Sequence, residues 1–178
     1  AGAGVFGHKT VGWYGANPSK GLPALVGLIC VYDVVTGAPL GVLDGTYITG
    51  IRTGAVGGLG AKLLARPDSR TLLVVGAGGQ CAYQVAATLE LMEGVNHVIV
   101  ANPHHPESAV AKAKALPGQV AALGVRTEGV DFESADSLES ACAQADIIIT
   151  CTMSRKPMID RLWVRPGTHL SCIGADMA

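Results

Sequence analysis

The sequence predicts an α/β protein with a parallel sheet and part of a second, α+β domain. Short β-branched runs alternate with helical segments of about ten residues from Thr71 onward, which is the pattern of βαβ units. A glycine-rich turn joins the first of these runs to the segment behind it, as in a Rossmann-type domain. Before that point, strand-like runs precede one long helical segment. The breaker sequence ARPDSR (65–70) separates the modules, so we expect domains over 1–66 and 67–178.

The first module is expected to contain three strands followed by a glycine-rich helix. The strand-like runs are Val5–Tyr14, Ala24–Asp33 and Pro39–Leu43. A Thr36-Gly37 turn makes the last two a hairpin. Asp44 can cap a helix over Thr46–Leu64, and five glycines lie inside that helix. Each glycine costs about 1 kcal/mol relative to alanine, so we expect this helix to pack tightly against other backbone.

The second module is expected to alternate strands and helices to the end of the chain. The predicted strands are Thr71–Val75, His97–Ala101, a weak one near Val125, Ile147–Thr150 and His169–Ile173. The predicted helices are Gln80–Met92, Pro106–Leu116 and Ser137–Ala145. Parallel strands connected by helices leave ligand-binding loops at the carboxyl edge of the sheet.

The composition excludes several classes of protein. Hydrophobic residues make up 49% and the net charge is −1 with no basic block, which argues against a nucleic-acid surface. The mean hydropathy of +0.37 fits a sheet buried on both faces or a surface that meets another chain. The five cysteines contain no C-x-x-C, so neither a disulfide scaffold nor a zinc site is expected.

Location and completeness can also be predicted. No apolar run is long enough to span a membrane, and the first residues have no signal-peptide pattern, so a cytoplasmic location is expected. The chain lacks an initiator methionine and stops directly after a strand-like run. We therefore expect a fragment that lacks sequence at both ends.

The stretch LLVVGAGGQCAYQVA (72–86) is typical of a nucleotide-binding turn. Gly76 makes the tight turn, and Gly78 allows backbone to approach a pyrophosphate. The helix behind them offers N–H groups and its positive dipole end to phosphates. The alternative is a tight strand–helix turn without a ligand. Cys81 stands where glycine or alanine is usual, either as a small packing residue or in a redox role.

The end of the second strand of this module leaves the choice between NAD and NADP open. An acidic residue there would bind the ribose 2′-hydroxyl of NAD, but this chain has Asn102. No arginine follows to hold a 2′-phosphate, although Ser108 or the histidines could do so. No metal is expected at His104 and His105, because adjacent side chains point apart and no third ligand is evident.

Several blocks of the chain, in order, resemble the ornithine cyclodeaminase/μ-crystallin family. The central one is GIRTGAVGGLGAKLLARPDSRTLLVVGAGGQ (50–80). The others are GHKTV (7–11), GLPALVGLICVYDVVTGAPLGVLDG (21–45) and IGAD (173–176). The resemblance covers nearly the whole chain, and family members carry further sequence at both ends. It implies that residues 1–66 belong to a substrate-binding and dimerisation domain, that 67–178 form the dinucleotide-binding domain, and that the protein is a homodimer.

The resemblance also implies roles for individual residues. Lys9 and Arg52 would bind a substrate α-carboxylate, and Lys9 is a candidate for a further role at the reacting carbon. A guanidinium grips a carboxylate with two parallel hydrogen bonds, which agrees with this role. Asp176 matches the catalytic acid/base. Residues implied to contact the dinucleotide are Arg52, Thr53, Gly76, Gly78, Gly79, Gln80, Asn102, Thr152 and Ser171.

For each of the three charged residues, an ordinary structural role is the alternative. Lys9 could be an exposed strand lysine, Arg52 a structural arginine on a helix surface, and Asp176 a loop or cap aspartate.

Three functions are compatible with this set of residues. The favoured one is conversion of L-ornithine to L-proline and ammonia, with NAD as a recycled cofactor and NADP possible. The second is a ketimine or cyclic-imine reductase, or an alanine-dehydrogenase-like enzyme, with net consumption of the cofactor. The third is a non-catalytic, crystallin-like binder of NADPH or a small ligand. Lys9, Arg52 and Asp176 together favour an enzyme acting on a small amino or imino acid, without nucleic-acid or membrane partners.

Overall fold

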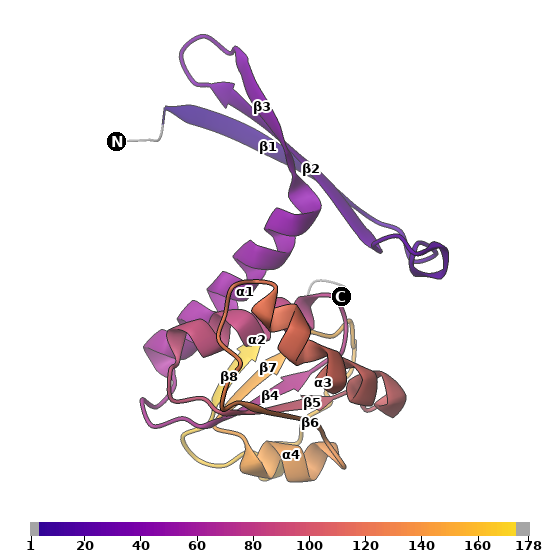
Figure 1. The fold of residues 1–178 in the computed structure, drawn as a ribbon, viewed down its shortest axis with the longest axis vertical. Coiled ribbons are helices and arrows are strands. Elements are labelled where there is room, and N and C mark those ends of the chain that lie inside the picture. The colour runs from indigo at the N-terminus through magenta and orange to yellow at the C-terminus, as the bar shows by residue number, and fades with distance from the viewer. Residues whose placement is uncertain (1–3, 174–178) are drawn as a thin grey trace. The chain divides into compact units, whose positions relative to one another are not determined.

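The computed structural model describes residues 4–173, which belong to two compact units (Figure 1). The first unit ends at Arg52 and the second begins at Thr53, so the division falls inside helix α1. The elements of the first unit are β1 (Val5–Trp13), the 3-10 turn η1 (Pro18–Lys20), β2 (Leu25–Asp33), β3 (Pro39–Asp44) and the start of α1 (Gly45–Leu64). The predicted strands and helix of this module are therefore present, with ends shifted by about one residue.

The three strands of the first unit form an antiparallel sheet in the order β1-β2-β3. Lys9 pairs with Ile29, and Ile29 pairs with Leu43, so these residues share one face of the sheet. Asp44 caps α1 as expected, because its Oδ1 accepts hydrogen bonds from the backbone N–H groups of Thr46 at 2.8 Å and Tyr47 at 3.3 Å. The strands thus lead directly into a helix whose start is fixed.

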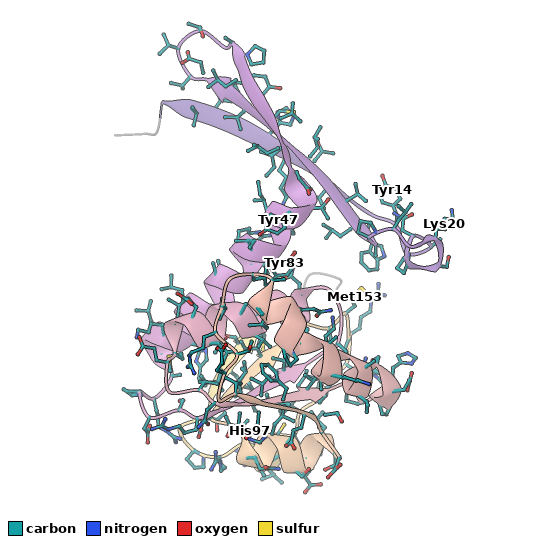
Figure 2. All side chains as sticks on the ribbon, viewed as in Figure 1. Tyr14, Lys20, Tyr47, Tyr83, His97 and Met153 are labelled. Carbon is teal, nitrogen blue, oxygen red and sulfur yellow. The ribbon has the colours of Figure 1, made fainter. Side chains whose placement is uncertain are left out.

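Apolar side chains on both faces of this small sheet are exposed. Figure 2 shows side chains standing off the two faces. The exposed apolar residues of β1 to β3 are Val5, Phe6, Val11, Trp13, Val26, Leu28, Leu40, Val42 and Leu43. Exposed apolar patches on a protein surface often mark an interaction site. The high hydropathy of the chain therefore has a source outside the core of the parallel sheet.

The second unit is built around a five-stranded parallel sheet with the order β6-β5-β4-β7-β8. Its elements after α1 are β4 (Thr71–Val75), α2 (Gln80–Leu91), β5 (His97–Ala101), α3 (Pro106–Ala121), β6 (Asp131–Ser134), α4 (Leu138–Gln144), β7 (Ile147–Thr150), the 3-10 turn η2 (Arg161–Trp163) and β8 (His169–Cys172). Helices α2 and α3 cover one face and α4 the other (Figure 1). The predicted α/β class with a Rossmann-type parallel sheet is confirmed.

Two predicted elements of the second unit differ from the structure. The strand expected near Val125 is wrong: the third strand of the module, β6, lies at Asp131–Ser134, where Phe132 is its only apolar residue. Helix α3 was expected to end at Leu116 but continues to Ala121, through Pro117. Proline lacks an N–H and crowds the preceding turn. The extension survives because Leu116 and Val120, on either side of Pro117, are both fully buried.

The glycines of α1 allow close contact with α2 in the second unit. A Cβ atom on Gly54 would lie 2.5 Å from the carbonyl oxygen of Tyr83, and one on Gly58 would lie 2.7 Å from that of Ala87. Gly54, Gly57 and Gly58 are buried and follow helical spacing, so together they form one stripe. The tight packing expected of this glycine-rich helix is confirmed.

Candidate functional site

The glycine turn lies where the carboxyl ends of β5, β4 and β7 meet. The N–H of Gly76 donates to the carbonyl of Ala101 at 2.8 Å, and the N–H of Cys151 donates to the carbonyl of Val75 at 2.9 Å. Gly76 has a φ of +119°, and a Cβ there would lie 2.6 Å from the carbonyl oxygen of Cys151. Only glycine fits this position. Strand order reverses between β4 and β7, which is where open α/β sheets place their ligands.

The start of α2 fits the pyrophosphate of a dinucleotide. Gly79 caps the helix without any side-chain hydrogen bond, so the first N–H groups have no side-chain cap. A Cβ on Gly78 or Gly79 would meet no heavy atom of the described residues within 4 Å, so the space in front of these amides is open. Gln80 carries a buried Oε1 without a hydrogen-bond partner in the described part of the chain. An anion at this helix end would meet backbone donors and a favourable dipole.

Two more of the predicted cofactor residues lie beside this turn. Asn102 directly follows Ala101, the last residue of β5. The carbonyl of Ala101 accepts the hydrogen bond from the N–H of Gly76. Thr152 follows β7, and its Cγ2 would lie 3.1 Å from a Cβ on Gly76. Its Oγ1 accepts from the N–H of Ser154 at 3.3 Å, which orders the start of the loop. The structure therefore brings the ends of three neighbouring strands to one point.

Two further predicted cofactor residues make contacts elsewhere in the second unit. The carbonyl of Thr53 accepts a hydrogen bond from the side-chain amide of buried Gln84 at 3.1 Å. Ser171 lies on β8, and its Oγ is 2.9 Å from Nε2 of His169. Burial lowers the pKa of His169, which favours a neutral ring. Thr53 thus contacts α2, and Ser171 contacts a residue of its own strand.

The predicted carboxylate-binding residues lie on β1 and α1 of the first unit. Lys9 Nζ donates to Thr49 Oγ1 at 2.7 Å, and Thr49 is buried in α1. Arg52 is exposed and follows Thr49 by three residues, so the two side chains share a face of the helix. Two glycines permit this approach, since a Cβ on Gly45 would lie 2.7 Å from the backbone of Gly27. The ammonium of Lys9 is therefore held on the helical face that also carries Arg52.

Sequence reasoning missed Thr49, although a signal for it was present. Thr49 stands one helical turn before Arg52, on the face that the resemblance already marked. Its hydroxyl also donates to the carbonyl of Gly45. It is therefore the residue that orients Lys9.

One predicted site residue lies outside the described range. It is Asp176, the expected acid/base, which is among residues 174–178. Between residues 4 and 173, no three His, Cys, Asp or Glu side chains gather in a way that could hold a metal ion. In the same range no helix is long and apolar enough to cross a membrane.

Of the two cysteines near the glycine turn, Cys81 is buried and Cys151 is half-buried. Cys81 is fully buried in the core beneath the turn, and the Sγ of Cys151 donates to the carbonyl of Gly76 at 3.4 Å. Burial raises the pKa of both thiols to about 12. Because the thiolate is the reactive form, Cys81 is suited to packing and not to redox chemistry.

The order of thiol modification is a testable consequence. At pH 8, alkylation of the native protein is expected to label exposed Cys172 first, and Cys81 and Cys151 roughly a thousandfold more slowly, because almost none of either thiol is ionised. Peptide mass mapping over time measures this order. A Cys172→Ser variant should lose the fast label. Fast labelling of Cys81 in the native state would contradict its buried position.

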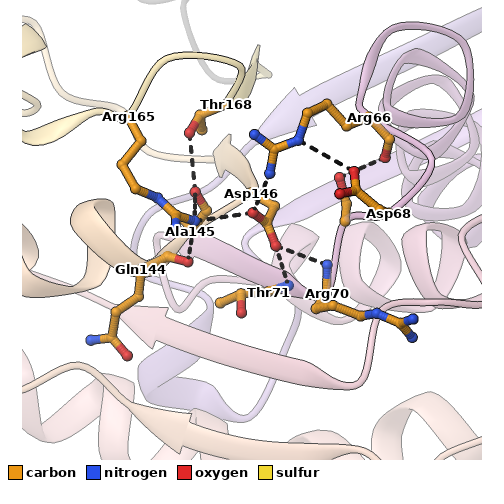
Figure 3. A network of polar contacts seen from close by, with 10 residues as sticks. Arg66, Asp68, Arg70, Thr71, Gln144, Ala145, Asp146, Arg165 and Thr168 are labelled. Carbon is orange, nitrogen blue, oxygen red and sulfur yellow. Dashed lines mark hydrogen bonds and ion pairs between the residues drawn. The ribbon is translucent and has the colours of Figure 1, made fainter.

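A polar cluster lies at the amino ends of the parallel strands, opposite the glycine turn (Figure 3). Asp146, which precedes β7 and is 9% exposed, accepts hydrogen bonds from the N–H groups of Arg70 at 2.8 Å and Thr71 at 3.1 Å. Its Oδ1 also pairs with Arg66 at 2.8 Å and Arg165 at 3.0 Å. The segment ARPDSR, predicted as a domain boundary, is therefore fixed to the sheet.

A parallel sheet with a glycine turn at its switch point and an uncapped helix behind that turn defines an α/β protein of the nucleotide-binding type. A comparison with models of protein families shows to which family within this class the chain belongs. The ornithine cyclodeaminase/mu-crystallin family model matches residues 1–178, and the chain belongs to that family. The resemblance predicted from the sequence blocks is confirmed.

Three known proteins are similar to this chain over more than nine-tenths of its length. The chain is 38% identical over 170 residues to a Δ1-pyrroline-2-carboxylate reductase of Paracoccus denitrificans, covering 96% of this chain and 51% of that protein. It is similar to a solved Δ1-pyrroline-2-carboxylate reductase of Thermococcus litoralis in complex with NADH and L-proline (TM-score 0.80, 34% identity, 92% of this chain and 48% of that one). A solved lysine cyclodeaminase that recognises L-lysine, L-ornithine and L-2,4-diaminobutyric acid gives a TM-score of 0.78 at 31% identity, over 96% and 47% of the two chains. The chain thus spans about half the length of these relatives.

Proposed function

We propose that this protein is a nicotinamide-dinucleotide-dependent enzyme that acts at the Cα–N bond of a small amino or imino acid. Reduction of a cyclic imine such as Δ1-pyrroline-2-carboxylate is the reaction that we favour. The observation that carries the proposal is the contact between Lys9 and Thr49, which holds a cation on the face of α1 that bears Arg52. Two cations on one face suit the carboxylate that every amino acid and imino acid carries.

The glycine turn supports the cofactor half of the proposal. Gly76 fits only because it lacks a Cβ, and the uncapped start of α2 faces open space beside Gly78 and Gly79. The pyrophosphate of NAD would use those amides, and Asn102 would lie at the position that contacts the adenosine ribose. When bound, the nicotinamide supplies hydride transfer to or from carbon. The relative solved in complex with NADH and L-proline supports the same assignment.

The residues of the chain would bind the substrate and control its protons. Arg52 would hold the carboxylate through two parallel hydrogen bonds, and Lys9, oriented by Thr49, would add a third. Holding the carboxylate would fix the position of Cα in the site, which is the main contribution of such a clamp to the rate. Asp176 is our candidate for the group that gives or takes the proton at nitrogen.

Cyclodeamination of ornithine, which the sequence favoured, becomes the second candidate. It is supported by the similarity to the lysine cyclodeaminase that recognises L-ornithine. The reductase is preferred because two relatives in the comparison carry that activity, one of them at 38% identity. Homodimerisation and a cytoplasmic location stay predictions, and the exposed apolar sheet of the first unit supports the former.

One pair of assays separates these reactions. With Δ1-pyrroline-2-carboxylate, we expect L-proline to form with equimolar loss of the absorbance of reduced nicotinamide. With L-ornithine and NAD⁺, we expect no proline. Proline and ammonia formed from ornithine without net change in that absorbance would instead establish the cyclodeaminase. No turnover with either substrate or with alanine, despite NADH binding, would favour the non-catalytic binder.

A further inference from the structure

Two consecutive hydrogen bonds begin at Asn102, directly after β5, and the donor and acceptor of each can be assigned. Asn102 Nδ2 donates to Ser108 Oγ at 2.8 Å, and Ser108 Oγ donates to the carbonyl oxygen of His105 at 2.7 Å. A serine hydroxyl has one proton, and the backbone carbonyl can only accept. Ser108 Oγ is therefore an acceptor towards Asn102. The NH₂ group of the amide consequently faces Ser108, and its carbonyl oxygen faces away.

This direction gives Oδ1 of Asn102 a defined chemistry. No hydrogen bond from residues 4–173 reaches that oxygen, and Asn102 is half-buried at the carboxyl edge of the sheet. A carbonyl oxygen accepts a hydrogen bond from a ribose hydroxyl. It offers nothing to a phosphate, whose oxygens also accept. NAD carries a hydroxyl at the 2′ position, where NADP carries a phosphate.

The surroundings of this amide also disfavour a second phosphate. Residues 102–111 include no lysine or arginine, and the next cation along α3, Lys112, donates to Gln119 Oε1 at 3.3 Å. Glu107 lies in the first turn of α3, 3.4 Å from Nδ1 of His105. The first position of α3 is Pro106, which has no N–H, and the N–H of Ser108 is bonded to the His105 carbonyl at 3.0 Å. The helix end that could hold a phosphate is therefore short of donors and carries a negative charge.

We propose that Ser108 is a positioning residue that fixes the amide of Asn102 and thereby makes the protein select NAD(H) over NADP(H). The inference rests on the proposed function, because it takes the glycine turn to bind a dinucleotide. It goes further because it names the preferred cofactor, NAD(H), and the residue that determines the preference, Ser108. The sequence alone left that choice even, since it has neither an acidic residue at position 102 to exclude a 2′-phosphate nor an arginine behind it to hold one.

The test compares the affinities of NADH and NADPH without substrate, by titrating nicotinamide fluorescence with the full chain. The wild type is expected to bind NADH at least tenfold more tightly. Ser108→Ala removes the acceptor that holds the amide, so NADH binding should weaken by about fivefold, a typical effect of one neutral hydrogen bond. NADPH binding should stay the same or strengthen. Ser108→Thr keeps the hydroxyl and should restore the wild-type ratio, and Ser140→Ala, on α4, should change neither affinity.

A second variant tests the same idea without touching Ser108. Asn102→Asp supplies only acceptors and a negative charge, so the preference for NADH should widen by about tenfold. Equal affinities in the wild type, an unchanged ratio in Ser108→Ala, or no widening in Asn102→Asp would each overturn the inference and leave the dinucleotide function intact. If the folded wild type bound neither cofactor, the proposed function would fall together with it.

Discussion

Arg52→Ala is expected to lower kcat/KM for Δ1-pyrroline-2-carboxylate by roughly 10²- to 10⁴-fold. The proposed role of Arg52 is to bind the substrate carboxylate with two charge-assisted hydrogen bonds, each worth about 1.5–3 kcal/mol. Arg52→Lys should recover little of this loss, because an ammonium cannot form the parallel pair of bonds. Steady-state kinetics on the purified variants, with NADH saturating, measures the effect.

The substrate can be varied to test the partner of Arg52. Δ1-pyrroline has the same ring without the carboxylate, so the wild type should use it poorly and Arg52→Ala should reduce its turnover little further. Lys62→Ala, an exposed cation later on the same helix, is the matched control and should behave as the wild type. Equal losses on both substrates, or a matching loss of NADH affinity, would assign Arg52 to the cofactor and not to the carboxylate.

The parallel sheet could be predicted because its sequence signals are local. Thr71–Val75, His97–Ala101 and Ile147–Thr150 are short apolar runs of β-branched residues, and the structure places strands at those residues. Gly76 was predictable for the same reason, since a strand that enters G-x-G and then a helix needs a backbone that only glycine adopts. β6 was not predictable, because Phe132 alone gives no alternating pattern over four residues.

Contacts between distant segments could not be derived from the sequence. Lys9 and Thr49 are 40 residues apart, and their hydrogen bond depends on Gly27 and Gly45 letting strand and helix approach. Nothing in the local pattern of either residue indicates the other. The resemblance supplied Lys9 as a site residue, but it did not supply what holds Lys9 in place. The structure adds Thr49 as the residue to which the ammonium of Lys9 donates.

Asp146→Asn is expected to lower the free energy of unfolding of the second unit by about 2–4 kcal/mol. The carboxylate satisfies two backbone N–H groups, of Arg70 and Thr71, and pairs with Arg66 and Arg165. An asparagine would offer one carbonyl oxygen to these four donors and turn its NH₂ towards some of them. Donors left without an acceptor near a buried group cost about 1–3 kcal/mol each. Urea unfolding followed by circular dichroism measures the loss.

The chain offers a closely matched control for this substitution. Asp68 also pairs with Arg66, at 3.4 Å, but its side chain is 79% exposed. Asp68→Asn should therefore change the free energy of unfolding by no more than about 0.5 kcal/mol, as for most exposed ion pairs. Equal effects of the two substitutions would mean that the charge of Arg66, and not the buried position of Asp146, decides the outcome.

The pH dependence of the Asp146 effect follows from the direction of its pKa shift. Burial raises the pKa of Asp146, but the N–H groups of Arg70 and Thr71 and the charges of Arg165 and Arg66 outweigh it, so the pKa is lowered overall. A carboxyl whose pKa is lower in the folded state stabilises that state fully above its unfolded pKa of about 3.9, and this contribution is lost as the pH falls through the folded pKa. The difference between wild type and Asp146→Asn should therefore be constant above about pH 5 and shrink below about pH 4. A difference that grew on acidification would require Asp146 to be protonated in the native protein, and the ion pairs with Arg66 and Arg165 could not then exist.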